Sequence, residues 1–491
     1  MELPEIRQQV AQHLNEAQLA AAAAVCKAWN STFTPVLYCK VNWSTSNLNA
    51  ETKKAQLAFQ KHAFFLREMT LDFLDNPKDA AASLDAFTHI ESINFQFKIF
   101  DDNLYRKNIS QFIHQNPGIT TVNVTFEHWG NPPTQFLRTL SSCPKLKSFR
   151  VRWGSLDQKD IELFLQGTSD RLEKLALEGT EIRPRYIFNP HRAENWRLPE
   201  QLPKLEHLSL HVSFPALQQI ALIERCPRLK EFAWFPTTDC GTFPVSKFIN
   251  ILATKCPLII GLCLECCPLL DKDFSVIVDS CQTSISNASF YQTKFGPLSV
   301  KSLLARHANS LTLLNLVDCI AVTSAMTQQL LVSCPKLTNF YSTILNARDI
   351  LGITEGNGED AEKIHPQPWA CTNIQVLEVY IGGLEDKPLH WRRLVYQQIG
   401  RLEKLEELDV NPSDRVMRLI PRRFLSHERV TDGLKLQLQF GLDNLGSLKR
   451  LNKLIFYKIE QKMEKKDVQW MVDSWPKLKG LHGISILTTK A

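Results

Sequence analysis

Glycine is scarce in this sequence, at 19 of 491 residues, which is about 4% where globular proteins average ~7%. Long flexible or low-complexity linkers are therefore not expected. An excess of one charge is also lacking, because 57 basic residues against 51 acidic ones leave a formal net charge of +6. This balance excludes a strongly basic nucleic-acid binder and an acidic disordered chain.

Long apolar runs are lacking as well. The alanine run Ala20–Ala24 is far shorter than the ~20 apolar residues that cross a bilayer, so no membrane contact is expected. Residues Met1–Pro4 carry no basic segment with an apolar stretch behind it, and no secretory signal is expected. The thirteen cysteines then indicate reduced thiols, and the expected location is intracellular, in the cytoplasm, the nucleus or both.

Short catalytic and phosphate-binding motifs are missing: no G-x-x-x-x-G-K-[ST], G-x-G-x-x-G, H-E-x-x-H or G-x-S-x-G occurs. Cys263, Cys266 and Cys267, with Cys256 nearby, suggest a zinc site or a cryptic hydrolase as an alternative. However, Cys263 lies between two leucines of an expected strand, and a closed zinc site needs four convergent ligands. We therefore predict structural cysteines, no catalytic residue, no cofactor and no metal.

What the sequence does contain is a repeat. The pattern Pro-x-Leu-x-x-Leu-x-Leu recurs with conservative exchanges, for example at 143–151, 202–210 and 226–234. The middle apolar residue of each copy is taken as its marker, and the markers follow one another about every 29 residues. Between markers the apolar spacing becomes helical. The fifteen markers are Met69, Ile93, Val122, Phe149, Leu175, Leu208, Phe232, Leu262, Ala288, Leu314, Phe340, Leu377, Leu408, Leu454 and Leu481.

This pattern resembles the leucine-rich repeat, and several copies resemble its cysteine-containing subtype. Those copies have Cys-Pro before the strand or a cysteine three residues after its last leucine. The resemblance implies a curved α/β solenoid over residues 66–491, with one short strand and one helix in each of about 15 irregular repeats. It also implies that these thiols are buried in the turns. The cysteines concerned are Cys143, Cys226, Cys256, Cys267, Cys319 and Cys334.

Three spacings between markers are longer than the rest, and insertions in repeat arrays often lie on the binding face. They contain the segments 183–197, 354–363 and 414–429. We expect a target protein to contact the last of these, and a solvated loop is the alternative. The arginine pairs of the chain are too sparse to track a nucleic-acid backbone. The candidate target-binding residues are Arg422, Arg423, Phe424 and Arg429.

The first forty residues do not follow the repeat. They predict three short helices, the first with Ile6, Val10 and Leu14 on one apolar face. They contain Leu-Pro-Glu-Ile at 3–6, Val-Cys-Lys-x-Trp at 25–29 and Pro-Val-Leu-Tyr at 35–38. This segment resembles the F-box, which we assign to residues 1–40, with a junction over 41–65. Two departures are the absence of an upstream helix and the alanine run at 20–24.

An F-box followed by leucine-rich repeats resembles the substrate receptors of SCF-type cullin–RING ubiquitin ligases. The resemblance implies a non-catalytic subunit that docks on the adaptor, and through it on the cullin, while the solenoid holds a target protein for ubiquitination and degradation. A protein-interaction scaffold or inhibitor without a link to ubiquitin is the alternative function. The residues expected to bind the adaptor are Leu3, Pro4, Ile6, Val10, Leu14, Leu19, Val25 and Trp29.

Overall fold

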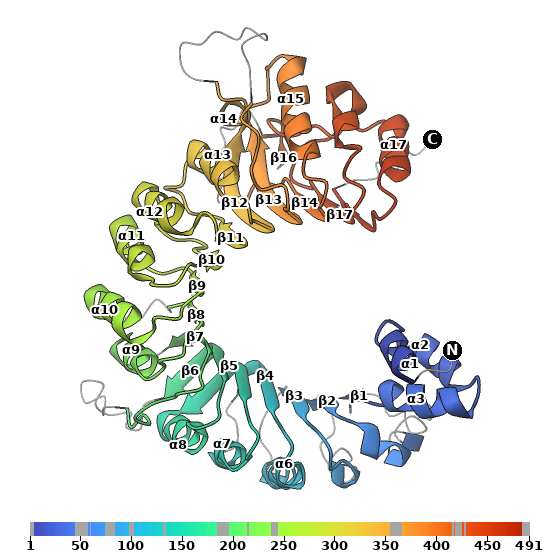
Figure 1. Cartoon of the computed structure of the whole chain (residues 1–491), viewed down its shortest axis with the longest axis vertical. Helices are drawn as coiled ribbons and strands as arrows, with labels where there is room; N and C mark the ends of the chain where they lie inside the picture. The colour runs from blue at the N-terminus through green and yellow to red at the C-terminus, as the bar shows by residue number, and fades with distance from the viewer. Residues whose placement is uncertain are drawn as a thin grey trace. The chain divides into compact units, whose positions relative to one another are not determined.

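The computed structural model divides into two compact units, and each is described by itself. The first unit comprises residues 1–229 and 236–244, and the second comprises 230–235 and 245–491. Within each unit the strands line one side of the repeats and the helices cover the other (Figure 1). The structure describes residues 4–44, 57–58, 60–73, 84–97, 103–130, 134–183, 196–213, 216–236, 244–353, 366–414, 417, 425–426 and 429–483.

The first unit opens with three helices and continues as a ladder of parallel strands. Along β3 and β7, half-buried and buried side chains alternate, because successive residues of a strand point to opposite faces. The helices are α1 (Pro4–Ala11), α2 (Glu16–Ala23), α3 (Lys27–Leu37), α6 (Asn103–Gln115), α7 (Thr134–Ser141), α8 (Gln158–Thr168) and α9 (Ala216–Glu224), with 3-10 turns η1 (Ala63–Phe65) and η2 (Leu84–Ala86). The strands are β1 (Lys40–Ser44), β2 (Glu68–Phe73), β3 (Ser92–Phe97), β4 (Thr121–Gly130), β5 (Ser148–Asp157), β6 (Lys174–Arg183) and β7 (His207–Ser213).

The second unit follows the same alternation of strand and helix, mostly with shorter strands. Its main strands are β8 (Glu231–Trp234), β9 (Gly261–Leu264), β10 (Asn287–Ser289), β11 (Leu313–Leu316), β12 (Asn339–Asn346), β13 (Val376–Gly382), β14 (Glu407–Asp409), β17 (Lys453–Ile455) and β18 (Gly480–His482). Its helices are α10 (Val245–Lys255), α11 (Asp271–Ser280), α12 (Pro297–His307), α13 (Ser324–Ser333), α14 (Ala347–Ile350), α15 (Leu389–Gly400) and α17 (Lys465–Ser474), with 3-10 turns η6 (Leu438–Phe440) and η7 (Leu442–Leu445). A separate antiparallel pair joins β15 (Leu425–Ser426) to β16 (Arg429–Val430).

The predicted strand register is confirmed. In the first unit, each marker from Met69 to Leu208 lies opposite the next one on the neighbouring strand. The same holds in the second unit from Phe232 to Leu481. All markers are at most 2% exposed except Leu481, which is half-buried in the last described strand. The chain is therefore an α/β solenoid whose markers form the inward row of its strands.

The sheet begins earlier than the sequence indicated. Strand β1 pairs in parallel with β2, from Lys40 opposite Glu68 to Ser44 opposite Asp72. Val41 thereby extends the buried row by one position and lies opposite Met69. The expected junction over 41–65 thus contains a strand, and the expected start of the solenoid at residue 66 is wrong. The reason is that Lys-Val-Asn-Trp-Ser alternates as a strand does but lacks the leucines of the repeat pattern.

The six cysteines of the repeat pattern are all buried, as the resemblance implied. Where the Cys precedes Pro, its thiol lies after a helix. Cys226, for example, contacts the carbonyl of Leu222, four residues earlier, at 3.1 Å. Burial raises the pKa of the Cys256 and Cys334 thiols to about 12, so they stay protonated at neutral pH. The cysteines before Pro thus act as small apolar residues just after the helices, and Cys267 and Cys319 are buried after strands β9 and β11.

Two repeats carry a polar side chain near this turn position. Asn116 accepts a hydrogen bond from the Ile90 N–H at 2.9 Å, and His307 Nδ1 accepts one from the Ile285 N–H at 3.1 Å. In both cases the side chain reaches back to the preceding repeat, three residues before that repeat's marker. A buried backbone N–H needs such a partner. Both residues are buried, and each side chain supplies the acceptor.

His307 predicts an acid-sensitive second unit. Burial lowers the pKa of His307 below its usual 6.5; Arg306 acts in the same direction, and the Val278 carbonyl and Asp279 oppose the shift without cancelling it. A histidine with a lowered folded-state pKa stabilises the fold fully above ~6.5, and this stability is lost as the pH falls through the folded pKa. We expect the melting temperature to fall between pH 7.5 and pH 5, and to fall less in His307→Gln, whose amide keeps an acceptor and a donor. Calorimetry across this pH range measures the effect, with His13→Gln as the exposed-histidine control. Equal pH dependence of the melting temperature in wild type, His307→Gln and His13→Gln would contradict the prediction.

Among the helices that the structure describes, none has the length and apolar character needed to span a bilayer.

Candidate functional site

The three N-terminal helices form a small bundle with its own core. Leu19, Phe33 and three alanines are buried together, and Leu14 and Trp29 pack against them. Asn15 begins α2 with reciprocal hydrogen bonds to Gln18, of 2.9 and 3.0 Å. The bundle thus has the three helices that the sequence predicted. The alanines let the helices pack closely, but they bury little apolar surface.

The bundle leaves part of its apolar surface in solvent. Pro4 is exposed, Ile6 is 42% exposed and Val25 is 63% exposed, while Val10 is half-buried. Three of the eight residues expected at the adaptor surface are therefore directly available in the free chain. Leu3, a fourth, lies outside the described residues.

The expected roles of three others need revision. Leu19 is only 6% exposed and belongs to the core of the bundle, so its assignment to the adaptor surface is corrected. Leu14 and Trp29 are half-buried and pack on that core, and Trp29 contacts Phe33 with ring centroids 5.4 Å apart. These side chains shape the bundle, and Pro4, Ile6 and Val25 are the expected adaptor residues that remain exposed.

Helix α1 turns an unexpected face inward. Its buried residues are Arg7, 8% exposed, and Ala11, 1% exposed, whereas Ile6 faces solvent. Within the described part of the chain, the Arg7 Nε has no hydrogen-bond partner. Ile6 is thus exposed and Val10 half-buried, while a charged residue and an alanine occupy the inner side of this helix. A lone bundle gains nothing from this arrangement, since exposed apolar surface stabilises only when something covers it.

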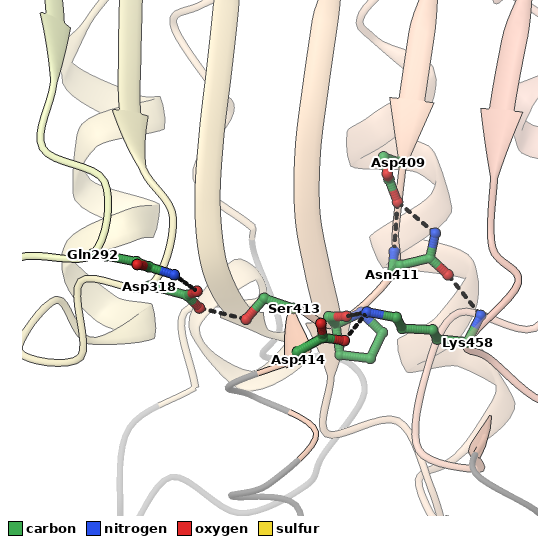
Figure 2. A network of polar contacts seen from close by, with 8 residues as sticks. Gln292, Asp318, Asp409, Asn411, Ser413, Asp414 and Lys458 are labelled. Atoms are coloured by element: carbon green, nitrogen blue, oxygen red, sulfur yellow. Dashed lines mark hydrogen bonds and ion pairs between the residues drawn. The ribbon is translucent and has the colours of Figure 1, made fainter. Parts of the chain in front are cut away.

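The insertion after β14 starts from a polar network (Figure 2). Ser413 Oγ donates to Asp318 Oδ1 at 2.5 Å, although the two residues are 95 positions apart. Asp414 pairs with Lys458 at 2.7 Å, and the backbone N–H of Lys458 donates to Asn411 Oδ1 at 2.8 Å. These contacts hold residues 411–414, which follow β14, against residues that follow strands β11 and β17 of two other repeats.

The segment that follows the insertion is also fixed by hydrogen bonds. The carboxylate of Asp432 accepts hydrogen bonds from the N–H groups of Gly383, Leu384 and Glu385 at 2.7–2.8 Å. Tyr380 donates its hydroxyl to the Asp432 carbonyl, and burial raises the pKa of this phenol well above its usual range. Both flanks of the insertion are therefore fixed to the solenoid.

Of the residues expected to bind a target, only Arg429 is described. It lies half-buried on β16, opposite Ser426 of β15. Arg422, Arg423 and Phe424 lie outside the described residues, and their role stays a prediction.

The cysteine cluster of the second unit shows why its thiols are poor ligands. Cys263 is half-buried on β9 and contacts Glu265 at 3.2 Å, and burial together with this carboxylate raises its pKa. Burial raises the pKa of Cys267 to about 12. Zinc binds thiolates, and both effects oppose their formation. Across the described ranges, no group of three or more His, Cys, Asp or Glu side chains is placed to hold a metal ion.

The sequence interpretation missed the turn on which the network is built. Cys266, Gln292 and Asp318 adopt left-handed backbone conformations, with φ of 51°, 54° and 60°, and they follow one another every 26 residues. Gln292 links the other two through side-chain contacts of 3.5 Å to Cys266 and 3.4 Å to Asp318. Each lies four residues after its marker. The regular spacing of 26 residues could have indicated this turn, but a search for apolar patterns does not detect it.

This geometry defines a solenoid of leucine-rich repeats. No protein-family model matches the chain, and no curated protein matches it. Among solved structures, it is similar to a chain of the Rad7 and Elc1 complex from yeast, with 15% identity, a TM-score of 0.44, and coverage of 78% of this chain and 94% of that one. It is also similar to the complex of TLR13 with ssRNA13, with 12% identity, a TM-score of 0.36, and coverage of 85% of this chain and 54% of that one. At these values neither similarity bears on function.

Proposed function

We propose that this protein is the substrate receptor of an SCF-type ubiquitin ligase. In this proposal the N-terminal bundle is an F-box that docks on the adaptor, and the solenoid binds the target protein. The observation that carries the proposal is the exposure of three apolar residues of the bundle, Pro4, Ile6 and Val25, within a segment that has the F-box sequence pattern. A partner that covers these side chains would bury apolar surface, which is worth ~25 cal/mol per Å².

Such a receptor acts by bringing the target close to the reacting subunit. It contributes no reacting group, and it raises the effective concentration of target lysines near the thioester carried by another subunit. The solenoid suits this task because its repeats are held in a common register, so a bound target keeps a defined position within each unit. The proposed target contacts remain Arg422, Arg423, Phe424 and Arg429. Support for them comes from the two anchored flanks of the insertion, at Ser413 and Asp432.

Adaptor capture tests the proposal. Ile6→Asp and Val25→Asp each replace an exposed apolar side chain by a charge, so we expect each variant to lose at least about tenfold in adaptor affinity, equivalent to ~1.4 kcal/mol. Both side chains are exposed, and the variants should melt at the wild-type temperature. Leu298→Asp is the matched control, because Leu298 is 52% exposed on α12 and outside the bundle.

The measurement is copurification of the adaptor and cullin with the full chain, followed by titration of the purified adaptor. Wild type that captures neither protein would refute the receptor function and favour a scaffold unconnected to ubiquitin. Variants that bind as tightly as wild type would place the adaptor contact elsewhere on the chain.

A further inference from the structure

A tryptophan lies in an unusual place on the strands of the first unit. Trp153 is 50% exposed on β5, although burial is the usual fate of so large an apolar side chain. Its backbone is left-handed, with φ of 60°. For a bulky residue this conformation is a true outlier that costs free energy. The chain therefore keeps a strained residue whose side chain is not used in the core.

The left-handed backbone at this position recurs in other repeats, but a tryptophan there does not. Trp153 follows its marker Phe149 by four positions, and Gly179 follows Leu175 by four and is also left-handed, with φ of 59°. Other residues at this position are Cys, Gln and Asp, which are small or polar. Glycine adopts the conformation without strain. A tryptophan here is a specific departure, and its half-exposed ring is the result.

The neighbouring strands are shaped around this ring. A Cβ atom on residue 179 would lie 2.5 Å from the Trp153 ring, so only glycine lets the indole lie against β6. On β7, His211 meets the indole edge-on, with ring centroids 6.4 Å apart and planes at 71°. Strands β5, β6 and β7 are consecutive in the sheet of this unit (Figure 1). The ring is therefore held in a defined orientation while half of its surface faces solvent.

Two arginines lie on the same strand as the ring. Arg150 and Arg152, on the same strand, share the single carboxylate of Glu178 on β6, at 2.9 and 2.7 Å. Each carboxylate oxygen takes one arginine, and each guanidinium has further N–H groups to offer. Both arginine side chains are more than 40% exposed. Two guanidiniums on one carboxylate leave one positive charge in excess on the strand that carries the exposed indole.

From this geometry we infer that Trp153, Arg150 and Arg152 form a peptide-binding surface for an acidic segment of a partner protein, in which a carboxylate adjoins an apolar side chain. The carboxylate would take the free N–H groups of the arginines, and the apolar side chain would cover the indole. Trp and Arg are the residue types that dominate interface energetics. A basic segment would be repelled by the excess positive charge of this surface. Single-stranded nucleic acid, which also stacks on aromatic rings, needs a longer basic track than two half-neutralised arginines provide.

This surface goes beyond the proposed adaptor contact, and its test is separate. A random dodecapeptide display library is selected on the full wild-type chain after depletion on Trp153→Gly. The expected consensus has Asp or Glu next to a large apolar residue. A synthetic peptide with that consensus should bind Trp153→Gly at least about tenfold more weakly than wild type. Arg152→Gln should also bind it more weakly, with a shallower salt dependence.

The controls distinguish binding from folding. Tyr457→Ala removes an aromatic residue that is also 50% exposed, and it should bind like wild type. Glycine removes the backbone strain, so Trp153→Gly should melt no lower than wild type, and Trp153→Asn replaces it if that variant misfolds. Adaptor capture should be unchanged in Trp153→Gly and in Trp153→Asn.

Several results would overturn the inference. They are the absence of an enriched peptide, a consensus without acidic residues, equal affinity in the Trp153 variants, or tighter binding of a single-stranded oligonucleotide. Self-association of wild type that Trp153→Gly abolishes would overturn it too, because a second copy would then be the occupant.

Discussion

Leu314→Asp is expected to unfold much of the second unit at room temperature. Leu314 is 0% exposed on β11, with Ala288 opposite it on one neighbouring strand and Phe340 on the other. A carboxylate at this position has no partner and loses its hydration. Changes of this kind cost more than ~4 kcal/mol, a large part of the ~5–15 kcal/mol that stabilises a typical protein. Because each repeat is stabilised by its neighbours, the damage should spread to the repeats on both sides.

Circular dichroism and limited proteolysis with mass spectrometry measure this effect. The variant should lose helical signal, and early cleavage should concentrate between residues 245 and 483. Asn315→Asp is the matched control, because it adds the same charge one residue later, on the opposite face of the strand. Its carboxylate can still accept the hydrogen bond that Asn315 takes from the Val317 N–H at 3.1 Å. If Leu314→Asp melts like this control, Leu314 does not point into the core and the register is wrong.

The strand register could be predicted from the sequence because burial on one face imposes a period of two. A shift by one residue would move a leucine row such as Leu175 and Leu177 into solvent. The same physics explains the failure at β1. Val41 is buried opposite Met69, but no leucine pattern surrounds it, and the helices before it suggested that the repeat had not begun.

The polar contacts could not be predicted in this way. The bond between Ser413 and Asp318 joins residues of the insertion and of a turn, and neither has a period that indicates the other. Helix α1 shows a second limit. Ile6, Val10 and Leu14 form an apolar row in the sequence, yet the bundle buries Arg7 and Ala11 of this helix instead. Periodicity identifies an apolar face, but it does not say whether the chain itself or a partner covers that face.

The left-handed turns could be predicted in part, because their spacing is regular but their residue types are not. Cys266, Gln292 and Asp318 share a spacing of 26 residues and one backbone conformation, but they share no residue type. Sequence patterns built on glycine or asparagine do not find such a turn. The backbone of the repeat imposes the conformation, and the side chain is then free to serve a network at Asp318 or a surface at Trp153.

The second large effect is expected from one amide in the first unit. Asn116 is 0% exposed and makes three buried hydrogen bonds. It accepts from the Ile90 N–H at 2.9 Å and donates to the carbonyls of Phe87 and Phe112, both at 2.8 Å. Asn116→Leu has a similar shape and leaves all three backbone groups without this partner. A buried unsatisfied group costs about 1–3 kcal/mol. We expect a loss of roughly 3–5 kcal/mol, since relaxation recovers part of the sum.

Asn116→Cys tells us whether the amide or its volume matters. Cysteine occupies the same place before Pro at Cys143 and Cys226, where its thiol contacts the carbonyl four residues earlier. In Asn116→Cys the thiol can therefore reach the Phe112 carbonyl, but the Ile90 N–H stays unpaired. The expected order of stability is wild type, then Asn116→Cys, then Asn116→Leu, as measured by urea unfolding of the full chain. Equal midpoints for Asn116→Leu and wild type would mean that Ile90 and the two carbonyls find other partners, and that the contact between these repeats is not held by the amide.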